Sequence, residues 1–430
     1  MNKCNSAHSR RKRSTPLVLE IPVRKVHQIG VAIFVLMLVV MACGGSAPTS
    51  QTPTTGDQLA TVVAATLQAA NPNLSPAPDS STSQPAALLP HSLYFLNNDS
   101  VSGAIQVFRL AADGKTTTQI TFEPSNVDAY SVSQADGSVA YVSNNQLLLV
   151  NADGSGRRMI VDGGAMDANS PFVNQVDAPV FSPDGQTLAY GYKGLNLYSL
   201  VGGSGNLVLE NQIDNAGGLS FPKELYAPDQ YSPDGNKLLV NLMYYEGGMA
   251  AVYVPASNTL IRLTGSEGAL TCCGESSWTP DSAALYSASR ESGMLTPGMW
   301  RSDASSGQIV ALTPSDYATG VFNYAYRPYL APDGQLYFFF NAANQEYDRR
   351  APLQMMRSAP DGVTNRAALR SENFGSITEA LWAPDASFVI VADPPLDQVY
   401  RGGLVELYYT DGQKAPISLA PFGMMFQWGP

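Results

Sequence analysis

The sequence predicts an all-β protein built as a β-propeller with seven blades, or with six if its first and weakest repeat is not a true one. A short turn motif recurs about every 50 residues, and an apolar segment of strand length follows each copy. The composition, 44% hydrophobic and 14% charged with 37 Gly and 30 Pro, is typical of short strands joined by turns. It excludes a coiled coil, a charged disordered chain and a multi-span membrane protein.

The repeated turn combines an aromatic residue or Leu with Ser, Thr or Ala, then Pro, Asp and usually Gly, as in residues 181–185 and 231–235. Pro fixes φ at the corner and Asp-Gly allows a tight reversal into the next strand. The aspartates of the six copies follow one another at intervals of 48, 50, 47, 52 and 52 residues: Asp136, Asp184, Asp234, Asp281, Asp333 and Asp385. Each unit is predicted to be a four-stranded antiparallel sheet that buries its faces against its neighbours.

The two ends of the repeat region are predicted to complete one blade together. Residues 426–430 read as the first half of the motif, and residues 92–95 read as the strand that should follow it. Six internal motifs and this split copy give the count of seven blades. Such a closure would also hide two sheet edges that otherwise promote aggregation.

The Ser-Pro-Asp-Gly motif followed by an apolar strand resembles the propeller repeat of the TolB-like family, over about 340 residues. The resemblance implies the fold but no single function, because this propeller occurs in periplasmic scaffolds and as the gating domain of prolyl oligopeptidase-like enzymes. TolB itself has six blades and a separate amino-terminal domain, which a tether replaces here. The peptidases also need a hydrolase domain, and these 430 residues leave none to build it.

Residues 1–42 are predicted to be an export signal, because seven Lys or Arg residues precede a short apolar run at residues 31–42. The run is shorter than the roughly 20 residues of a membrane-spanning helix. The sequence Val40-Met41-Ala42-Cys43-Gly44 resembles the lipobox of bacterial lipoproteins. That resemblance implies that Cys43 is lipidated and that acyl chains alone anchor the protein to a bacterial membrane, on its periplasmic or cell-surface side. An ordinary signal peptide and a twin-arginine signal are the alternatives.

Residues 43–90 are predicted to be a disordered tether, and residues 91–430 the propeller. The tether is rich in Ser, Thr, Pro and Ala, contains no aromatic residue and carries almost no charge. A segment of this composition cannot bury a core.

The sequence predicts no catalytic residue, metal site or cofactor. Only His91 would remain after signal cleavage, and no nucleophile-elbow or nucleotide-binding motif is present. After residue 42 the chain has 18 basic and 35 acidic residues, which argues against a nucleic-acid partner. The adjacent Cys272 and Cys273 are open to three interpretations: a vicinal disulfide, a bridge between molecules or two free thiols.

Antiparallel strand order predicts that the motif turns lie at one end of the propeller, which we call the turn end, and the longer loops at the other, the loop end. The turn end is expected to be fully occupied by its turns. Loops on a rigid scaffold often carry function, and Tyr and Arg dominate protein interfaces. The candidate binding residues of the loop end are Tyr244, Tyr245, Arg290, Glu291, Tyr347, Arg349, Arg350, Tyr400 and Arg401.

Together these features predict a lipid-anchored extracytoplasmic scaffold that binds a protein or peptide of the cell envelope. The alternative is a surface carbohydrate-binding protein or a glycoside hydrolase with two carboxylates. Carbohydrate chemistry would require a pocket with a carboxylate pair beside an exposed aromatic platform, whereas a scaffold would offer a broad open face.

Overall fold

The computed structural model describes residues 87–266, 269, 276–291, 296–347, 351–394 and 401–430. All of them belong to the second of two compact units, which begins at Ser83. The predicted signal, tether and lipidation site at Cys43 lie outside the described residues. The same is true of five residues singled out in the sequence: Cys272, Cys273, Arg349, Arg350 and Tyr400.

In the described residues, hydrogen bonds join the strands into six antiparallel sheets. Five of them use consecutive strands. They comprise β4 (Val127–Val132), β5 (Val139–Ser143), β6 (Gln146–Val150) and β7 (Arg158–Asp162); then β8 (Val176–Phe181), β9 (Thr187–Tyr192), β10 (Gly194–Ser199) and β11 (Ser204–Glu210); then β12 (Gln212–Ala216), β13 (Leu219–Tyr231), β14 (Leu238–Tyr244), β15 (Gly247–Val254) and β16 (Thr259–Arg262); then β17 (Ser276–Trp278), β18 (Ala284–Ser289), β19 (Gly298–Asp303) and β20 (Ile309–Ala311); and then β21 (Phe322–Leu330), β22 (Leu336–Ala343), β23 (Gln354–Ser358) and β24 (Ala367–Ala368).

The sixth sheet joins the two ends of the unit. In spatial order it contains β25 (Glu379–Trp382), β26 (Phe388–Asp393), β27 (Gly403–Tyr409), β28 (Ile417–Trp428), β1 (Leu93–Asn98), β2 (Ile105–Leu110) and β3 (Thr117–Gln119). In the part of the chain that the structure describes, two short 3-10 helices lie outside the sheets, at Pro171–Val173 and Pro255–Ser257. No helix among the described residues has the length and apolar character needed to cross a membrane.

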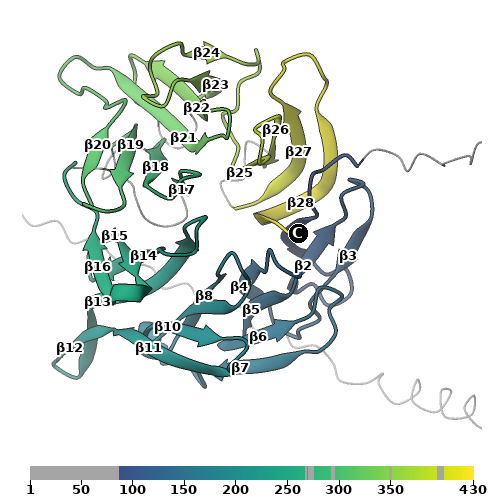
Figure 1. Cartoon of the computed structure of the whole chain (residues 1–430), viewed down its shortest axis with the longest axis vertical. Coiled ribbons are helices and arrows are strands. Elements are labelled where there is room, and N and C mark those ends of the chain that lie inside the picture. The colour runs from purple at the N-terminus through teal and green to yellow at the C-terminus, as the bar shows by residue number, and fades with distance from the viewer. Residues whose placement is uncertain (1–86, 267–268, 270–275, 292–295, 348–350, 395–400) are drawn as a thin grey trace, which may run out of the picture. The chain divides into compact units, whose positions relative to one another are not determined.

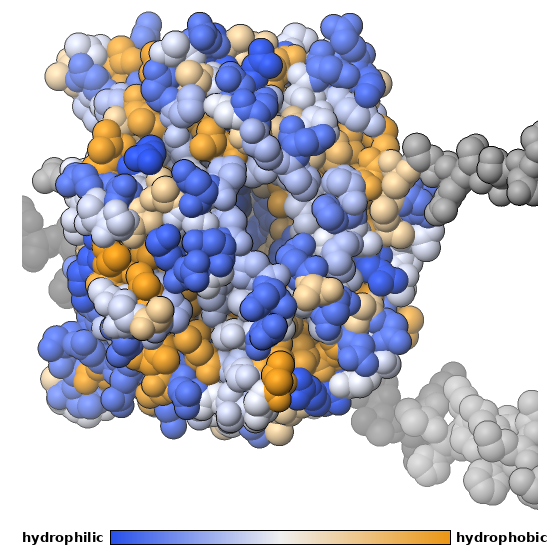
Figure 2. All heavy atoms as spheres, viewed as in Figure 1, coloured by the Kyte–Doolittle hydropathy of each residue, from blue (hydrophilic) through white to orange (hydrophobic). Residues whose placement is uncertain are grey.

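The sheets follow one another around a common centre, so the unit is a β-propeller (Figure 1). In Figure 1 the yellow β28 lies beside the dark blue β2 and β3. Figure 2 shows a hollow near the middle of the face in view, with mainly hydrophilic residues around it. The predicted all-β propeller is therefore confirmed.

Strand β28 closes the ring. Its first part pairs with β27, where Ile417 faces Leu407, and its last part pairs with β1, where Trp428 faces Leu93. The prediction that the two ends complete one sheet is therefore confirmed. Because β28 is shared by two four-stranded groups of a single seven-stranded sheet, the number of blades stays a prediction.

The motif turns are held by their aspartates. Asp184 Oδ1 accepts hydrogen bonds from the Ser182 hydroxyl at 2.5 Å and from the Gln186 amide at 3.0 Å. The same pair of donors recurs around Asp281, from the Thr279 hydroxyl at 2.6 Å and the Ala283 amide at 3.0 Å. These carboxylates thus satisfy backbone and hydroxyl groups that the tight reversal leaves without strand partners.

The aromatic residue of the motif links neighbouring four-stranded groups, as three tryptophans show. The indole of Trp278 donates to the carbonyl of Gln230 in the preceding group at 3.4 Å. Trp382 donates to the carbonyl of Arg327 at 2.8 Å, and Trp428 donates to that of Trp382 at 2.9 Å. Each indole N–H thus finds a carbonyl of the preceding group.

Candidate functional site

The predicted binding residues that the structure describes all lie between the second and third strands of a four-stranded group. Tyr244 and Tyr245 are at the turn from β14 to β15, and Arg290 and Glu291 follow β18. Tyr347 follows β22 and Arg401 precedes β27. Equivalent connections of antiparallel groups emerge at the same end of the ring, so these residues share the loop end.

The two tyrosines of the β14–β15 turn differ in their contacts with the rest of the protein. The Tyr244 hydroxyl accepts a hydrogen bond from Arg262 at 3.0 Å, and Arg262 also pairs with Glu224 at 2.7 Å. Tyr245 is 65% exposed, and its ring meets the edge of Phe221 with 5.5 Å between centroids. Tyr244 is therefore held by the scaffold, whereas Tyr245 presents an aromatic surface to solvent.

Two of the other described candidates, Tyr347 and Arg290, contact β21. The Tyr347 amide donates to the hydroxyl of the buried Tyr324 at 2.6 Å, and the guanidinium of Arg290 lies 4.4 Å from the ring centroid of Tyr326. Burial raises the pKa of Glu379, while the nearby charges of Arg327 and Arg401 act to lower it. Arg290 and Arg327 thus lie against the same ring, and Arg327 and Arg401 both act on the ionisation of Glu379.

Sequence reasoning missed Tyr326, Arg327 and Glu379. They lie on the innermost strands β21 and β25, where a register shift between Tyr326 and Tyr329 breaks the regular alternation of sides. The available signal was an Arg next to a Pro within an aromatic strand segment, which alone does not indicate a binding residue.

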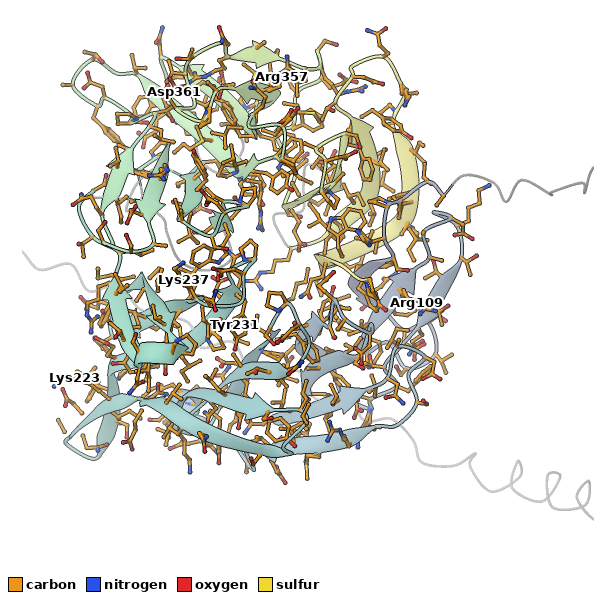
Figure 3. The ribbon with its side chains drawn as sticks, viewed as in Figure 1. Arg109, Lys223, Tyr231, Lys237, Arg357 and Asp361 are labelled. Carbon is orange, nitrogen blue, oxygen red and sulfur yellow. The ribbon has the colours of Figure 1, made fainter. Side chains whose placement is uncertain are left out.

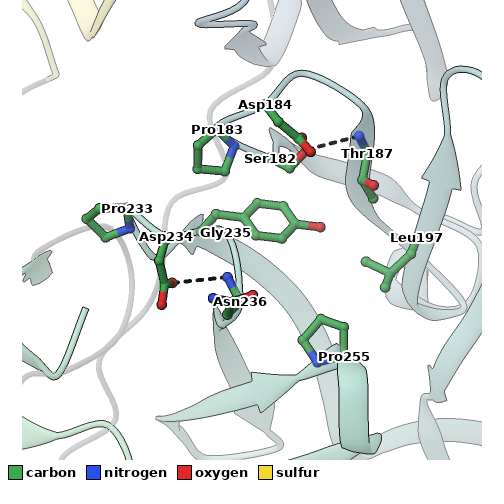
Figure 4. A pocket seen from close by; sticks show the side chains of 11 residues that line it. Ser182, Pro183, Asp184, Thr187, Leu197, Pro233, Asp234, Gly235, Asn236 and Pro255 are labelled. Atoms are coloured by element: carbon green, nitrogen blue, oxygen red, sulfur yellow. Dashed lines mark hydrogen bonds between the residues drawn. The ribbon is translucent and has the colours of Figure 1, made fainter. Parts of the chain in front are cut away.

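A pocket of about 530 Å³ lies between two neighbouring motif turns (Figure 4). One wall is residues 182–184 with Thr187, the other is residues 233–236 with Tyr231, and Leu197 and Pro255 complete the lining. Figure 3 shows Tyr231 nearer the middle of the ring than Arg109 or Arg357. The prediction that the turn end is fully occupied by its turns is wrong here, because each turn satisfies hydrogen bonds within itself and leaves the space between the two turns unfilled.

The pocket contains two ionised carboxylates. Hydrogen bonds from the Ser182 hydroxyl and the Gln186 amide lower the pKa of Asp184. Burial acts to raise the pKa of Asp234, but hydrogen bonds from Ser232 and Asn236 outweigh burial and bring it to about 2. Both carboxyl groups are therefore ionised at neutral pH. The general acid of a glycoside hydrolase must carry a proton, so neither group suits that role.

Tyr231 belongs to the pocket wall that residues 233–236 form. Burial raises the pKa of its hydroxyl, and the Asp184 charge raises it further. Within the described residues this hydroxyl is buried and has no hydrogen-bond partner. None of the described residues forms a cluster of three or more His, Cys, Asp or Glu side chains suited to a metal ion.

Comparison with protein-family models found no match, and comparison with curated proteins found none either. Among solved structures, a prolyl endopeptidase is 12% identical with a TM-score of 0.51, covering 78% of this chain and 49% of its own. TolB from Acinetobacter baumannii is 15% identical with a TM-score of 0.39, and the match covers 77% of this chain and 79% of that one. A putative TolB from Agrobacterium tumefaciens is 19% identical with a TM-score of 0.40, and the match covers 71% of this chain and 99% of that one.

At these identities, similarity to a solved structure concerns the fold alone. The chain matches about half the length of the prolyl endopeptidase. It is a β-propeller, and the structures to which it is similar include TolB, as the repeated turn motif predicted.

Proposed function

We propose that this chain is a lipid-anchored extracytoplasmic scaffold that binds a protein or peptide of the cell envelope at its loop end. The observation that carries the proposal is the gathering of aromatic and charged side chains at one end of a closed ring, including the exposed Tyr245 and Arg401. Long loops on a rigid ring can bind a partner without deforming the scaffold. The anchor and the location rest on the sequence of residues 1–43.

Crosslinking in native envelopes, followed by mass spectrometry of captured proteins, tests this proposal. The loop variant combines Tyr245→Ala with Arg401→Ala. The matched control combines Lys115→Ala with Val363→Ala, which removes an exposed cation and an exposed apolar side chain from hairpins at the turn end. A partner captured by the natural chain and the control, but not by the loop variant, is expected. Identical captures by all three proteins would refute binding at the loop end.

Carbohydrate binding is the second candidate, because one specific feature favours it. The pocket at the turn end is lined by Asp184, Asp234 and the half-buried Tyr231. Ionised carboxylates accept hydrogen bonds from sugar hydroxyls, and sugar rings pack on aromatic side chains. Since neither carboxyl group can donate a proton at neutral pH, the pocket suits binding rather than cleavage.

A screen of soluble glycans tests this second candidate. The variant Asn236→Trp would fill the pocket and keep the backbone amide that donates to Asp234 at 3.0 Å. Gln335→Trp is its equivalent in another repeat, where the amide donates to Asp333 at 2.9 Å. A glycan that binds the natural chain and the Gln335 variant, but not the Asn236 variant, is expected. If no glycan binds, or if both variants bind equally, the pocket is not a sugar site.

A further inference from the structure

We propose that Arg290 and Arg327, which both lie against the ring of Tyr326, form a binding site for a carboxylate group of the partner. We call these three residues the arginine site. The proposal rests on the proposed function, since it names the chemistry by which the loop end would recognise a peptide or protein.

The geometry of the arginine site comes from two neighbouring sheets. Arg290 directly follows β18, and Tyr326 and Arg327 lie within β21. The guanidinium carbons are 4.4 Å (Arg290) and 5.4 Å (Arg327) from the same ring centroid. Tyr326 is only 4% exposed, and its hydroxyl donates to the carbonyl of Thr378 at 2.6 Å. The Tyr326 ring is therefore held in place, and both guanidinium groups lie against it.

The backbone of β21 explains how Arg327 comes to lie there. The register shift in this strand accompanies a φ of 47° at Arg327, a left-handed conformation that is unfavourable for an Arg. Ala178 in β8 and Met425 in β28 have φ values of 47° and 57° beside similar shifts. The bulge thus belongs to the fold of the innermost strands, and at this position the sequence supplies a cation.

The two arginines differ in how their charges are balanced. Arg327 is close enough to Glu379 to influence its pKa. Arg290 makes no hydrogen bond or ion pair with any residue that the structure describes, and its Nη1 is buried without an acceptor. A buried donor left without an acceptor is destabilising. The contact with the Tyr326 ring offsets part of that cost, so an additional anion at Arg290 would be favourable.

A carboxylate fits these groups better than other anions that a peptide offers. Guanidinium N–H groups form a planar fork that matches the two oxygens of a carboxylate. The two guanidinium carbons are at most about 10 Å apart, so an anion bound at Arg290 is also attracted by the charge of Arg327. An acidic side chain and a carboxyl-terminal group both supply this chemistry.

Three capped hexapeptides serve as probes for the full-length chain in detergent micelles, with binding read by fluorescence anisotropy. Hexaglutamate with an amidated carboxyl terminus carries side-chain carboxylates only. Hexaglutamine with a free carboxyl terminus carries the terminal carboxylate only, and amidated hexaglutamine carries neither. We expect one or both carboxylate peptides to bind, and amidated hexaglutamine to bind at least tenfold more weakly.

The decisive variant is Arg290→Gln, which should weaken binding of the carboxylate peptides at least tenfold. Arg290→Lys keeps the charge but loses the planar fork, so its affinity should fall between the two. Arg357→Gln is the control, because Figure 3 shows Arg357 towards the outer part of the ring and its side chain is exposed on β23 of the same sheet as Tyr326. Thermal unfolding of each variant checks that the fold is retained.

Three outcomes would overturn the arginine site. The first is that neither carboxylate peptide binds. The second is that the Arg290→Gln and Arg357→Gln variants bind the carboxylate peptides equally well. The third is that inorganic phosphate displaces a bound peptide as readily as acetate does. Each leaves the proposed function standing if crosslinking still captures a partner that depends on Tyr245 and Arg401. Failure of that crosslinking overturns the function itself, so the two failures are distinguishable.

Discussion

Asp177 is a carboxyl group whose ionisation depends strongly on burial. It lies on β8, where its Oδ1 occupies the space that a side chain at Gly191 would need. Burial raises its pKa from 3.8 to about 6. The folded chain therefore holds this proton more tightly than the unfolded chain, and the resulting stability is lost as pH rises from about 4 through 6.

The variant Asp177→Asn should therefore become more stable than the natural chain as pH rises, by up to about 3 kcal/mol above pH 7. Below about pH 3 the two should differ little, since Asp177 is then neutral in both the folded and unfolded chain. Calorimetric melting temperatures at about pH 3 and pH 8 measure the effect, with the exposed Asp167→Asn as control. An equal difference at both pH values would contradict the role of burial.

A second prediction at the residue scale concerns the motif aspartates. Asp281→Ala removes the acceptor for the Thr279 hydroxyl and the Ala283 amide, and should cost about 1–2 kcal/mol in the free energy of unfolding. Asp281→Asn keeps a side-chain oxygen and should cost less. Urea unfolding of both variants provides the measurement. If Asp281→Ala unfolds like the natural chain, the carboxylate does not hold the turn.

At the scale of elements, contacts between hairpins of neighbouring sheets hold the ring together. Gly307, in the turn between β19 and β20, has a φ of 75°, and a Cβ there would lie 2.2 Å from the Arg262 carbonyl of β16. Gly334 has a φ of 77°, and a Cβ there would meet nothing within 4 Å. The two glycines thus share a backbone conformation but differ in surroundings.

Gly307→Ala should be more destabilising than Gly334→Ala. Both variants incur the cost of a left-handed alanine, about 1 kcal/mol. Gly307→Ala also pushes two sheets apart, which adds about 1–3 kcal/mol. Thermal unfolding measures both, and equal losses would show that the β16–β19 contact contributes little to the ring.

The sequence predicted elements best where a local signal repeats. The spacing of Asp184, Asp234 and Asp281 identified the repeated sheets, because a tight turn depends on a few adjacent residues. The extra strand β12 and the long β13 were not predicted, since pairing of Gln212–Ala216 with Leu219–Tyr231 extends one sheet without a motif of its own.

The candidate sites were less predictable than the fold. The pocket depends on the gap between the turns that contain Asp184 and Asp234, which side-chain packing between sheets determines. The arginine site depends on a register shift in β21, and a shift reverses the side on which Arg327 would otherwise project. Neither feature is encoded in the spacing of residues along one strand.

At the scale of the whole molecule, net charge opposes the attraction of an acidic partner. The chain after residue 42 carries 18 basic and 35 acidic residues, so a carboxylate peptide is repelled at long range and held only at the arginine site. Its association rate should therefore rise as salt increases from about 10 to 150 mM, since the screening length falls from about 30 to 8 Å. Stopped-flow anisotropy measures this rate, and a rate that falls with salt would contradict the charge argument.

The binding proposals depend on a closed ring, which the pairing of β1 with β28 provides. Amide hydrogen exchange, read by mass spectrometry on peptides covering Leu93–Asn98 and residues 424–428, tests that closure most directly. We predict protection of both strands comparable to that of the buried β18, and joint loss of protection in Trp428→Ala, which removes the indole that donates to Trp382. Rapid exchange of both strands in the natural chain, while β18 stays protected, would show that the ring is open.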